Sequence, residues 1–360
     1  MKHIPMAGLL LWAAGVVPAA ADDPSEGGIR LVHDEAAKKV EVRCGDRLFT
    51  AYLYPDSLDK PVLFPLLTAG GTAVTRGFPL DPKPGDRVDH PHQAGLWFNF
   101  GDVNGLDFWN NSYAIPPERK HRYGVIRHRA VKEMRSGQQE GSLTVTADWT
   151  DHAGHVLLDA ETRYVFAEQG NRRTVEHSIT LTAIGDTVVF TDNKEGLFAL
   201  RVDRAFEEPS DQPDIFIDAN GLPASAPTVN SGGANGRYRS SEGLEGSDVW
   251  GKPARRVSLS ARKNGEDITL TIADYPSNPG YPARWHARGY GLFAANNMGS
   301  RSFSPDAPLF TLRLLPGRSV TFKHLIIVDS GKADADVSKA KGEAPIAVSL
   351  SQSENKNLFD

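Results

Sequence analysis

Apolar and polar residues alternate with a period of two along most of this chain, and this alternation constrains the fold more than any other feature. A strand that is buried on one face shows this pattern, because successive side chains point to opposite faces. Hairpins with tight turns are predicted at residues 39–54, 143–166, 256–272 and 309–328, with a further strand at 174–182. No sustained helical periodicity occurs before residue 330. The sequence therefore predicts an all-β fold of antiparallel strands.

The composition is that of a folded protein that does not bind nucleic acid. Hydrophobic residues make up 40% of the chain and charged residues 24%, which is enough apolar material for a large core. Acidic residues number 45 and basic residues 40, so the chain lacks the positive charge that nucleic-acid binding requires. The sequence has no phosphate-binding glycine loop, dinucleotide fingerprint or nucleophile elbow, which argues against ATP, NAD and serine-hydrolase chemistry.

The first 21 residues have the pattern of a secretory signal peptide. Lys2 precedes an apolar run over residues 6–17, and small residues precede the expected cleavage after Ala21. The run is shorter than the stretch of about 20 residues that spans a bilayer, so a membrane anchor is the weaker alternative. We therefore expect a periplasmic or secreted protein without a membrane span after cleavage. Cys44 is the only cysteine, so the fold has no internal disulfide.

We expect one β domain over residues 22–330, followed by a polar tail over residues 331–360 that is loosely attached or disordered. Two long segments rich in Gly, Pro, Ser and Asn interrupt the strands, at residues 68–94 and 207–247. Loops of that length inside a compact domain are usually functional or disordered. The sequence therefore predicts long loops over one face of the sheets.

The densest group of chemically active side chains lies in residues 89–109. His90 and His92 flank a proline that favours an extended chain, so both imidazoles are expected to project the same way. Trp97 and Asn99 share a strand face with glycines, which suits a cleft for a flat polar ligand better than a packed core. Further candidates follow at Asp102, Asn104, Asp107 and Trp109. The alternative is a β-arch with hydrogen-bonded turn residues and two surface histidines.

Two later segments carry the remaining candidates. Residues 191–198 place Lys194 and Glu195 directly before an apolar strand, where a solvated turn is the ordinary alternative. Residues 274–288 form a proline-fixed loop with many large side chains, and such a loop more often builds a ligand wall than unused surface. The candidates in this loop and after it are Asn278, Arg284, Trp285, His286 and Asn296.

Four motifs give the chain a resemblance to a known family. They are His90-Pro-His-Gln-Ala-Gly-Leu-Trp-Phe, Gly101-Asp-Val-Asn-Gly-Leu-Asp-Phe-Trp, Asn193-Lys-Glu-Gly-Leu-Phe and Pro276-Ser-Asn-Pro-Gly-Tyr-Pro-Ala-Arg-Trp-His. They resemble the PmoA-like family of bacterial proteins, labelled methane oxygenase PmoA, over about residues 40–328. The resemblance implies a large β-sandwich of the galactose-mutarotase kind, a supersandwich, in the company of sugar-handling enzymes. We do not expect methane oxidation, because a particulate methane monooxygenase subunit is built from membrane-spanning helices.

The first of three hypotheses is an exported carbohydrate-active enzyme, a lyase, epimerase or hydrolase that acts on a sugar or oligosaccharide. Acid–base chemistry would then use His92 or His286 as the acid and Glu195 or Asp102 as the base. Indoles would stack on the sugar, and polar side chains would bind it. The indoles are Trp97, Trp109 and Trp285, and the polar side chains are His90, Asn99, Asn104, Asp107, Lys194, Asn278, Arg284 and Asn296.

The second hypothesis is a carbohydrate-binding module without catalysis, which would use the same aromatic and amide side chains. The third is a metal-dependent enzyme. His90 and His92, with Glu195 or His286, have the ligand types that bind zinc or non-haem iron. The pair must then recruit its other ligands from elsewhere in the fold. No other cofactor is expected.

Overall fold

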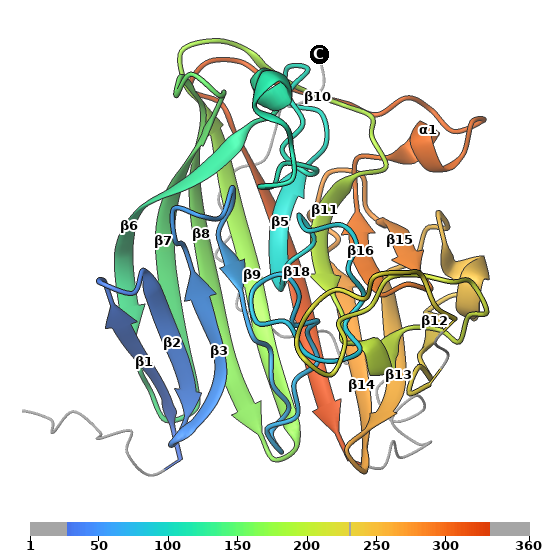
Figure 1. Cartoon of the computed structure of the whole chain (residues 1–360). Helices are drawn as coiled ribbons and strands as arrows, with labels where there is room; N and C mark the ends of the chain where they lie inside the picture. The colour runs from blue at the N-terminus through green and yellow to red at the C-terminus, as the bar shows by residue number, and fades with distance from the viewer. Residues whose placement is uncertain (1–26, 230–231, 332–360) are drawn as a thin grey trace, which may run out of the picture.

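The computed structural model describes residues 27–229 and 232–331, and strands dominate this part of the chain. Within it, two eight-stranded antiparallel sheets pack face to face beside a two-stranded sheet (Figure 1). The predicted all-β class and the large antiparallel sandwich are therefore confirmed. The expected signal peptide at residues 1–21 lies outside the described residues, as does the expected tail after residue 331.

Sheet 1 has the strand order β1-β2-β3-β4-β5-β11-β16-β15. Its strands are β1 (Ile29–Asp34), β2 (Lys39–Cys44), β3 (Arg47–Leu53), β4 (Val62–Leu63), β5 (Leu96–Phe100), β11 (Gly196–Arg201), β16 (Leu292–Asn296) and β15 (Arg284–Arg288). The predicted hairpin at 39–54 is confirmed as β2 and β3.

Sheet 2 has the order β12-β13-β14-β18-β9-β8-β7-β6. Its strands are β12 (Arg237–Ser240), β13 (Arg256–Lys263), β14 (Glu266–Asp274), β18 (Ser319–Ser330), β9 (Arg172–Ala183), β8 (Val156–Gln169), β7 (Glu140–Thr150) and β6 (Val125–Arg135). The short helices in the described residues are η1 (Pro117–Arg122), η2 (Arg204–Phe206), η3 (Gly246–Val249) and α1 (Ser300–Phe303). The hairpins predicted at 143–166 and 256–272 are confirmed.

The hairpin predicted at 309–328 is wrong. β17 (Thr311–Leu314) pairs with β10 (Val188–Thr191) in the small third sheet, whereas β18 pairs with β9 and β14. The turn at Pro316-Gly317 therefore separates two strands that belong to different sheets. Hydrophobic alternation identifies strands but does not identify their partners.

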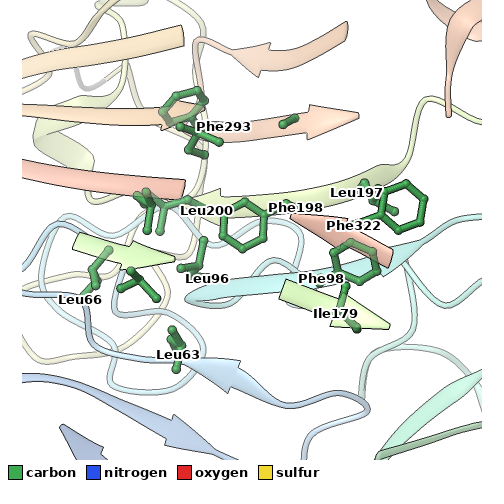
Figure 2. Close-up of a cluster of buried hydrophobic side chains, with 14 of the residues drawn as sticks. Leu63, Leu66, Leu96, Phe98, Ile179, Leu197, Phe198, Leu200, Phe293 and Phe322 are labelled. Atoms are coloured by element: carbon green, nitrogen blue, oxygen red, sulfur yellow. The ribbon is translucent and has the colours of Figure 1, made fainter. Parts of the chain in front are cut away.

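The main core fills the space between the two sheets. β5 and β11 contribute alternate residues to it, including Leu96, Phe98 and Phe198, which meet Ile179 of β9 and Phe322 of β18 (Figure 2). Phe98 and Phe322 have ring centroids 5.8 Å apart. Because strand side chains alternate between faces, the residues between these core positions face the outside of sheet 1.

A second apolar cluster covers that outer face. Trp97, Ala199 and Ala294 lie side by side on β5, β11 and β16, since Trp97 pairs with Ala199 and Ala199 with Ala294. Leu80 packs on the cluster from the long segment before β5, and Tyr290 from the β15–β16 turn. The predicted arrangement of long loops over one face is thus present. In the described part of the chain, no helix is both long and apolar enough to cross a membrane.

Candidate active site

The structure brings Glu195 and His286 together on sheet 1. Glu195 ends the turn before β11, and His286 lies in the middle of β15, two strands away in the sheet. Glu195 Oε2 lies 3.7 Å from His286 Nδ1. Asn296 of β16 fixes the turn, because its amide donates to the carbonyl oxygens of Asn193 and Lys194, each at 2.9 Å. Residues 191–198 and residues 274–288, the second and third candidate segments, therefore meet at Glu195 and His286.

Burial keeps His286 neutral. Its side chain is 4% exposed. Burial lowers the pKa of the imidazole to about 4, although the carboxylate of Glu195 favours the charged form. The Nδ1 atom lies 3.1 Å from the carbonyl oxygen of Lys194. Because a carbonyl can only accept, Nδ1 carries the hydrogen in this bond, and Nε2 is the basic nitrogen at neutral pH.

Residues 89–109, the first candidate segment, pack against Glu195 at Gly101, directly after β5. A Cβ atom at Gly101 would lie 2.8 Å from the Cβ of Glu195, so the glycine is what permits this close approach. Asp107 lies within electrostatic range of the same carboxylate. Burial raises the pKa of Asp107, and the charge of Glu195 raises it further, against hydrogen bonds from Asn110 and from the backbone N–H of Trp109 that lower it.

Two buried arginines hold the loop that carries His90 and His92. Arg76 is 1% exposed. Its guanidinium donates to the backbone carbonyls of Phe78, Arg87, Asp89, His90 and Gln93. Arg201, which ends β11, donates to Asp89 Oδ1 at 2.7 Å and to the side chain of Gln93. The loop is thereby fixed to sheet 1.

Asp89 orients His90 within this loop. Burial would raise the pKa of Asp89, but Arg201, the hydrogen bond from His90 and the charge of Arg76 together hold it well below its usual range. The His90 Nδ1 and Asp89 Oδ2 atoms are 2.7 Å apart. His90 adopts a left-handed φ of 41°, which is uncommon for a residue with a side chain. The extended chain expected at His90-Pro91-His92 is therefore wrong, because the chain turns here and Gln93 N donates to His90 O.

His90 and Tyr290 form a stacked aromatic pair beside the second apolar cluster, on the outer face of sheet 1. Their ring centroids are 5.2 Å apart and the planes differ by 3°. The guanidinium carbon of Arg201 lies 4.8 Å from the Tyr290 ring centroid. Burial raises the pKa of Tyr290, against Arg201, Arg288 and Gln93, and the charge of Glu195 raises it further. Since the His90 side chain is 42% exposed, the pair has one member at the surface.

His92 is buried, whereas His90 is partly exposed. Their ring centroids are 5.6 Å apart with the planes at 81°. The His92 pKa falls to about 2, chiefly through burial and then through the charge of Lys60. Lys60 donates to the His92 carbonyl. Among the described residues, no group of three His, Cys, Asp or Glu side chains is arranged to hold a metal ion. The zinc or iron hypothesis therefore lacks its remaining ligands in this part of the chain.

The structure contradicts a stacking role for the indoles. Trp97, Trp109 and Trp285 are at most 2% exposed, so their faces pack against protein and not against a ligand. Trp97 Nε1 donates to Asn99 Oδ1 at 3.0 Å, and Trp285 Nε1 donates to the Ala254 carbonyl at 2.9 Å. These residues support the site from within the protein.

Several polar candidates also have structural partners. Asn99 Nδ2 donates to the Phe108 carbonyl, and Asn278 Nδ2 donates to Asp274. Asp102 and Asn104 are turn residues that bond Gly105 N and Val189 N respectively. Arg284 donates to the Gly251 carbonyl. Lys194 keeps an exposed side chain and pairs with Glu195.

Sequence reasoning missed Tyr290, Arg201 and Arg76 as members of this site. Arg201 had a detectable signal, since a charged residue ends the otherwise apolar run Gly196-Leu-Phe-Ala-Leu. A buried charge of that kind needs a buried partner, which Asp89 supplies. Two cavities, of about 510 and about 580 Å³, are lined by other residues along β6.

Known structures resemble this chain in fold. A galactosidase domain of an alpha-galactosidase-sucrose kinase has 11% identity and a TM-score of 0.39, covers 84% of this chain, and is itself covered over 42% of its length. A galactose 1-epimerase from Lactobacillus acidophilus has 10% identity and a TM-score of 0.33, and the match covers 85% of this chain and 100% of the epimerase chain. A galactose mutarotase-like protein from Clostridium acetobutylicum has 12% identity and a TM-score of 0.31, with coverage of 84% and 97%. These likenesses concern the fold alone.

Sequence comparison identifies the family. No curated protein matches the chain. Residues 39–341 match a family described as a family of unknown function, DUF6807. The expected membership of the PmoA-like family is therefore wrong, because the family that matches is this one. Since the match extends over most of the 360 residues, the chain belongs to the family of unknown function DUF6807.

Proposed function

We propose that the protein is an enzyme that moves protons on a carbohydrate, of the epimerase or lyase class. The reaction is assigned to Glu195, His286, Tyr290 and His90, which we call the proton-transfer cluster. The observation that carries this proposal is the approach of the Glu195 carboxylate to the buried His286 imidazole, at 3.7 Å. A base held beside a carboxylate is a common arrangement in proton-transfer enzymes, because the carboxylate stabilises the imidazolium once it forms.

The structure supports distinct roles for the two members of this pair. His286 is neutral at pH 7 and accepts a proton at Nε2, so it serves as base and not as the acid that the sequence suggested. Glu195 faces the Nδ1 side of the same ring and stabilises the positive charge that develops there. The carboxylate thus acts through the imidazole.

Tyr290 provides the proton donor in this proposal. A phenol carries its proton at neutral pH, and burial raises the pKa of Tyr290 further. The stacked His90 ring, oriented by Asp89, extends the aromatic surface to the solvent. An aromatic surface of this kind, with the Arg288 guanidinium 5.5 Å from the Tyr290 ring, suits a sugar ring, which has apolar faces and a polar edge.

Hydrolysis by two carboxyl groups has less support. Asp102 accepts a turn hydrogen bond from Gly105 N. Asp107 accepts from the backbone N–H groups of Trp109 and Asn110, and its second oxygen accepts from the Asn110 amide. Both carboxylates are therefore engaged in holding the local chain.

A panel of neutral aldoses, uronates and oligosaccharides, followed by NMR in D₂O, tests the proposal. We expect turnover of at least one class, with a loss of about 100-fold or more in His286→Asn and in Tyr290→Phe, the usual contribution of a proton-transfer group. Glu195→Gln should lower kcat and leave the KM nearly unchanged. Lys132→Gln on exposed β6 is the matched control. Binding without turnover across the panel would instead support the binding module, and turnover unaffected by all three variants would refute the proposal.

A further inference from the structure

A second group of aromatic and ionisable side chains lies at the edge of the sandwich, outside the proton-transfer cluster. It lines a cavity of about 510 Å³ where β1, the β3–β4 loop and β6 meet. Its chemically active lining includes His33, Lys38, Tyr54, Lys60, Arg127 and His128. A volume of this size accommodates a monosaccharide or disaccharide.

The aromatic wall of this cavity is rigid. The Tyr54 and His128 rings lie against each other, with centroids 3.9 Å apart. The Tyr54 hydroxyl lies 2.7 Å from His33 Nε2, and the Tyr52 hydroxyl lies 3.1 Å from His128 Nδ1. These contacts hold the Tyr54 ring at its hydroxyl and the His128 ring at Nδ1. A wall fixed in this way offers a ligand a preformed surface, which reduces the entropy lost on binding.

Arg127 supplies the positive charge that is available to a ligand. Its Nη1 atom donates to the Leu58 carbonyl at 2.9 Å, and its Nη2 lies 3.9 Å from Asp59 Oδ1, which is a loose ion pair. Nη1 also donates to the Asp56 carbonyl at 3.4 Å, so among the described residues the Nε–H and the Nη2 group are the donors left for a ligand. The side chain is 47% exposed, and it also lines the neighbouring cavity of about 580 Å³.

The other charges of the wall are paired, buried or at the rim. Lys60 is buried, and its ammonium donates to the His92 carbonyl. Lys38 pairs with Asp56. Arg129 pairs with Asp148 and with Asp159. Glu35 is exposed at the rim. Arg127 is therefore the group that can meet an incoming carboxylate with two parallel hydrogen bonds, the geometry that a guanidinium favours.

We propose that this cavity binds a sugar acid, a pyranose that bears a carboxylate, with the carboxylate on Arg127 and the ring beside Tyr54. The proposal does not depend on the reaction assigned to the proton-transfer cluster. Lys60 lines the cavity and donates to the carbonyl of His92, which belongs to the same loop as His90.

Isothermal titration of the full chain tests this inference with three probes: D-glucuronate, D-glucose and acetate. D-glucuronate has both the ring and the carboxylate, and each of the other two has one of them. We expect D-glucuronate to bind at least about 10-fold more tightly than either, since a hydrogen bond to a charged group contributes that much affinity. Arg127→Gln should remove this preference, and Arg127→Lys should keep part of it.

The controls separate this site from the other one. Arg135→Gln removes an exposed arginine from the same strand and should leave D-glucuronate binding unchanged. His286→Asn should also leave it unchanged, so loss of turnover and loss of this binding are independent results. The proposal fails if D-glucuronate binds no more tightly than D-glucose or acetate. It also fails if Arg127→Gln, with a melting temperature like that of the wild type, retains the preference.

Discussion

The buried histidine His177 makes the stability of the sandwich depend on pH. It lies on β9 in the core between the sheets, with its ring centroid 4.8 Å from that of Phe198 and 5.4 Å from that of Phe98. Neither ring nitrogen has a hydrogen-bond partner among the described residues. Burial lowers the pKa of His177 from 6.5 to about 3, because the core cannot solvate an imidazolium.

The magnitude follows from the linkage between protonation and folding. The folded-state pKa lies below the unfolded one, so the unfolded chain takes up the proton first as the pH falls. Stability is therefore fully present above about pH 6.5 and is lost progressively down to about pH 3. With these two pKa values, His177 destabilises the fold by about 2 kcal/mol at pH 5 relative to pH 8.

Urea denaturation of His177→Leu at pH 8 and at pH 5 measures this effect. Leucine has a similar volume and no ionisable group, so the loss of stability between the two pH values should be about 2 kcal/mol smaller than in the wild type. His121→Asn, at an exposed position of η1, is the control and should leave the wild-type difference unchanged. If His177→Leu also leaves it unchanged, the histidine is not held neutral by the core.

Three further predictions concern the site and its support. Gly101→Ala would push its Cβ to 2.8 Å from the Cβ of Glu195 and displace the carboxylate, so turnover should fall at least about 10-fold while the melting temperature changes little, measured by kinetics and calorimetry. Arg201→Met leaves Asp89 buried with one fewer partner and should cost about 3 kcal/mol in urea denaturation, whereas the exposed Arg135→Met should cost under about 1 kcal/mol; equal losses would contradict the buried clamp. Burial raises the pKa of the Cys44 thiol to about 12, so a thiol reagent should label it only as fast as the chain unfolds, and rapid labelling of the folded protein would contradict its burial.

The sequence was sufficient to predict the fold class, because a period of two is a local property of each strand. The β13–β14 hairpin was predictable for the same reason, since Asn264-Gly265 places both turn residues at positive φ. The pairing between strands that are distant in the sequence could not be predicted in this way. A tight turn joins β17 to β18, but β17 pairs with β10, because tertiary packing sets strand partners.

The candidate site was predictable in part. Glu195 was indicated by its place before an apolar strand, and His286 by the segment 274–288, and the structure brings the two together. The expected loop at 274–288 is wrong in part, because residues Arg284–Arg288 form β15. Trp97 and Trp109 were misjudged, because the outer face of sheet 1 is covered by loop residues such as Leu80 and packs as a second core. Trp285 lies in the main core instead. A strand sequence cannot show whether a face that carries tryptophan is covered by another segment of the chain.

The proton state of His286 is the most direct test of the proposed site. Nitrogen-15 NMR of the full chain, with the signal assigned by its loss in His286→Asn, reports the tautomer and the pKa. We predict a neutral ring with hydrogen on Nδ1 at pH 7, and a titration midpoint near the low pKa, about 4, that burial imposes. An imidazolium at pH 7, or a neutral ring with hydrogen on Nε2, would contradict the role of His286 as the base.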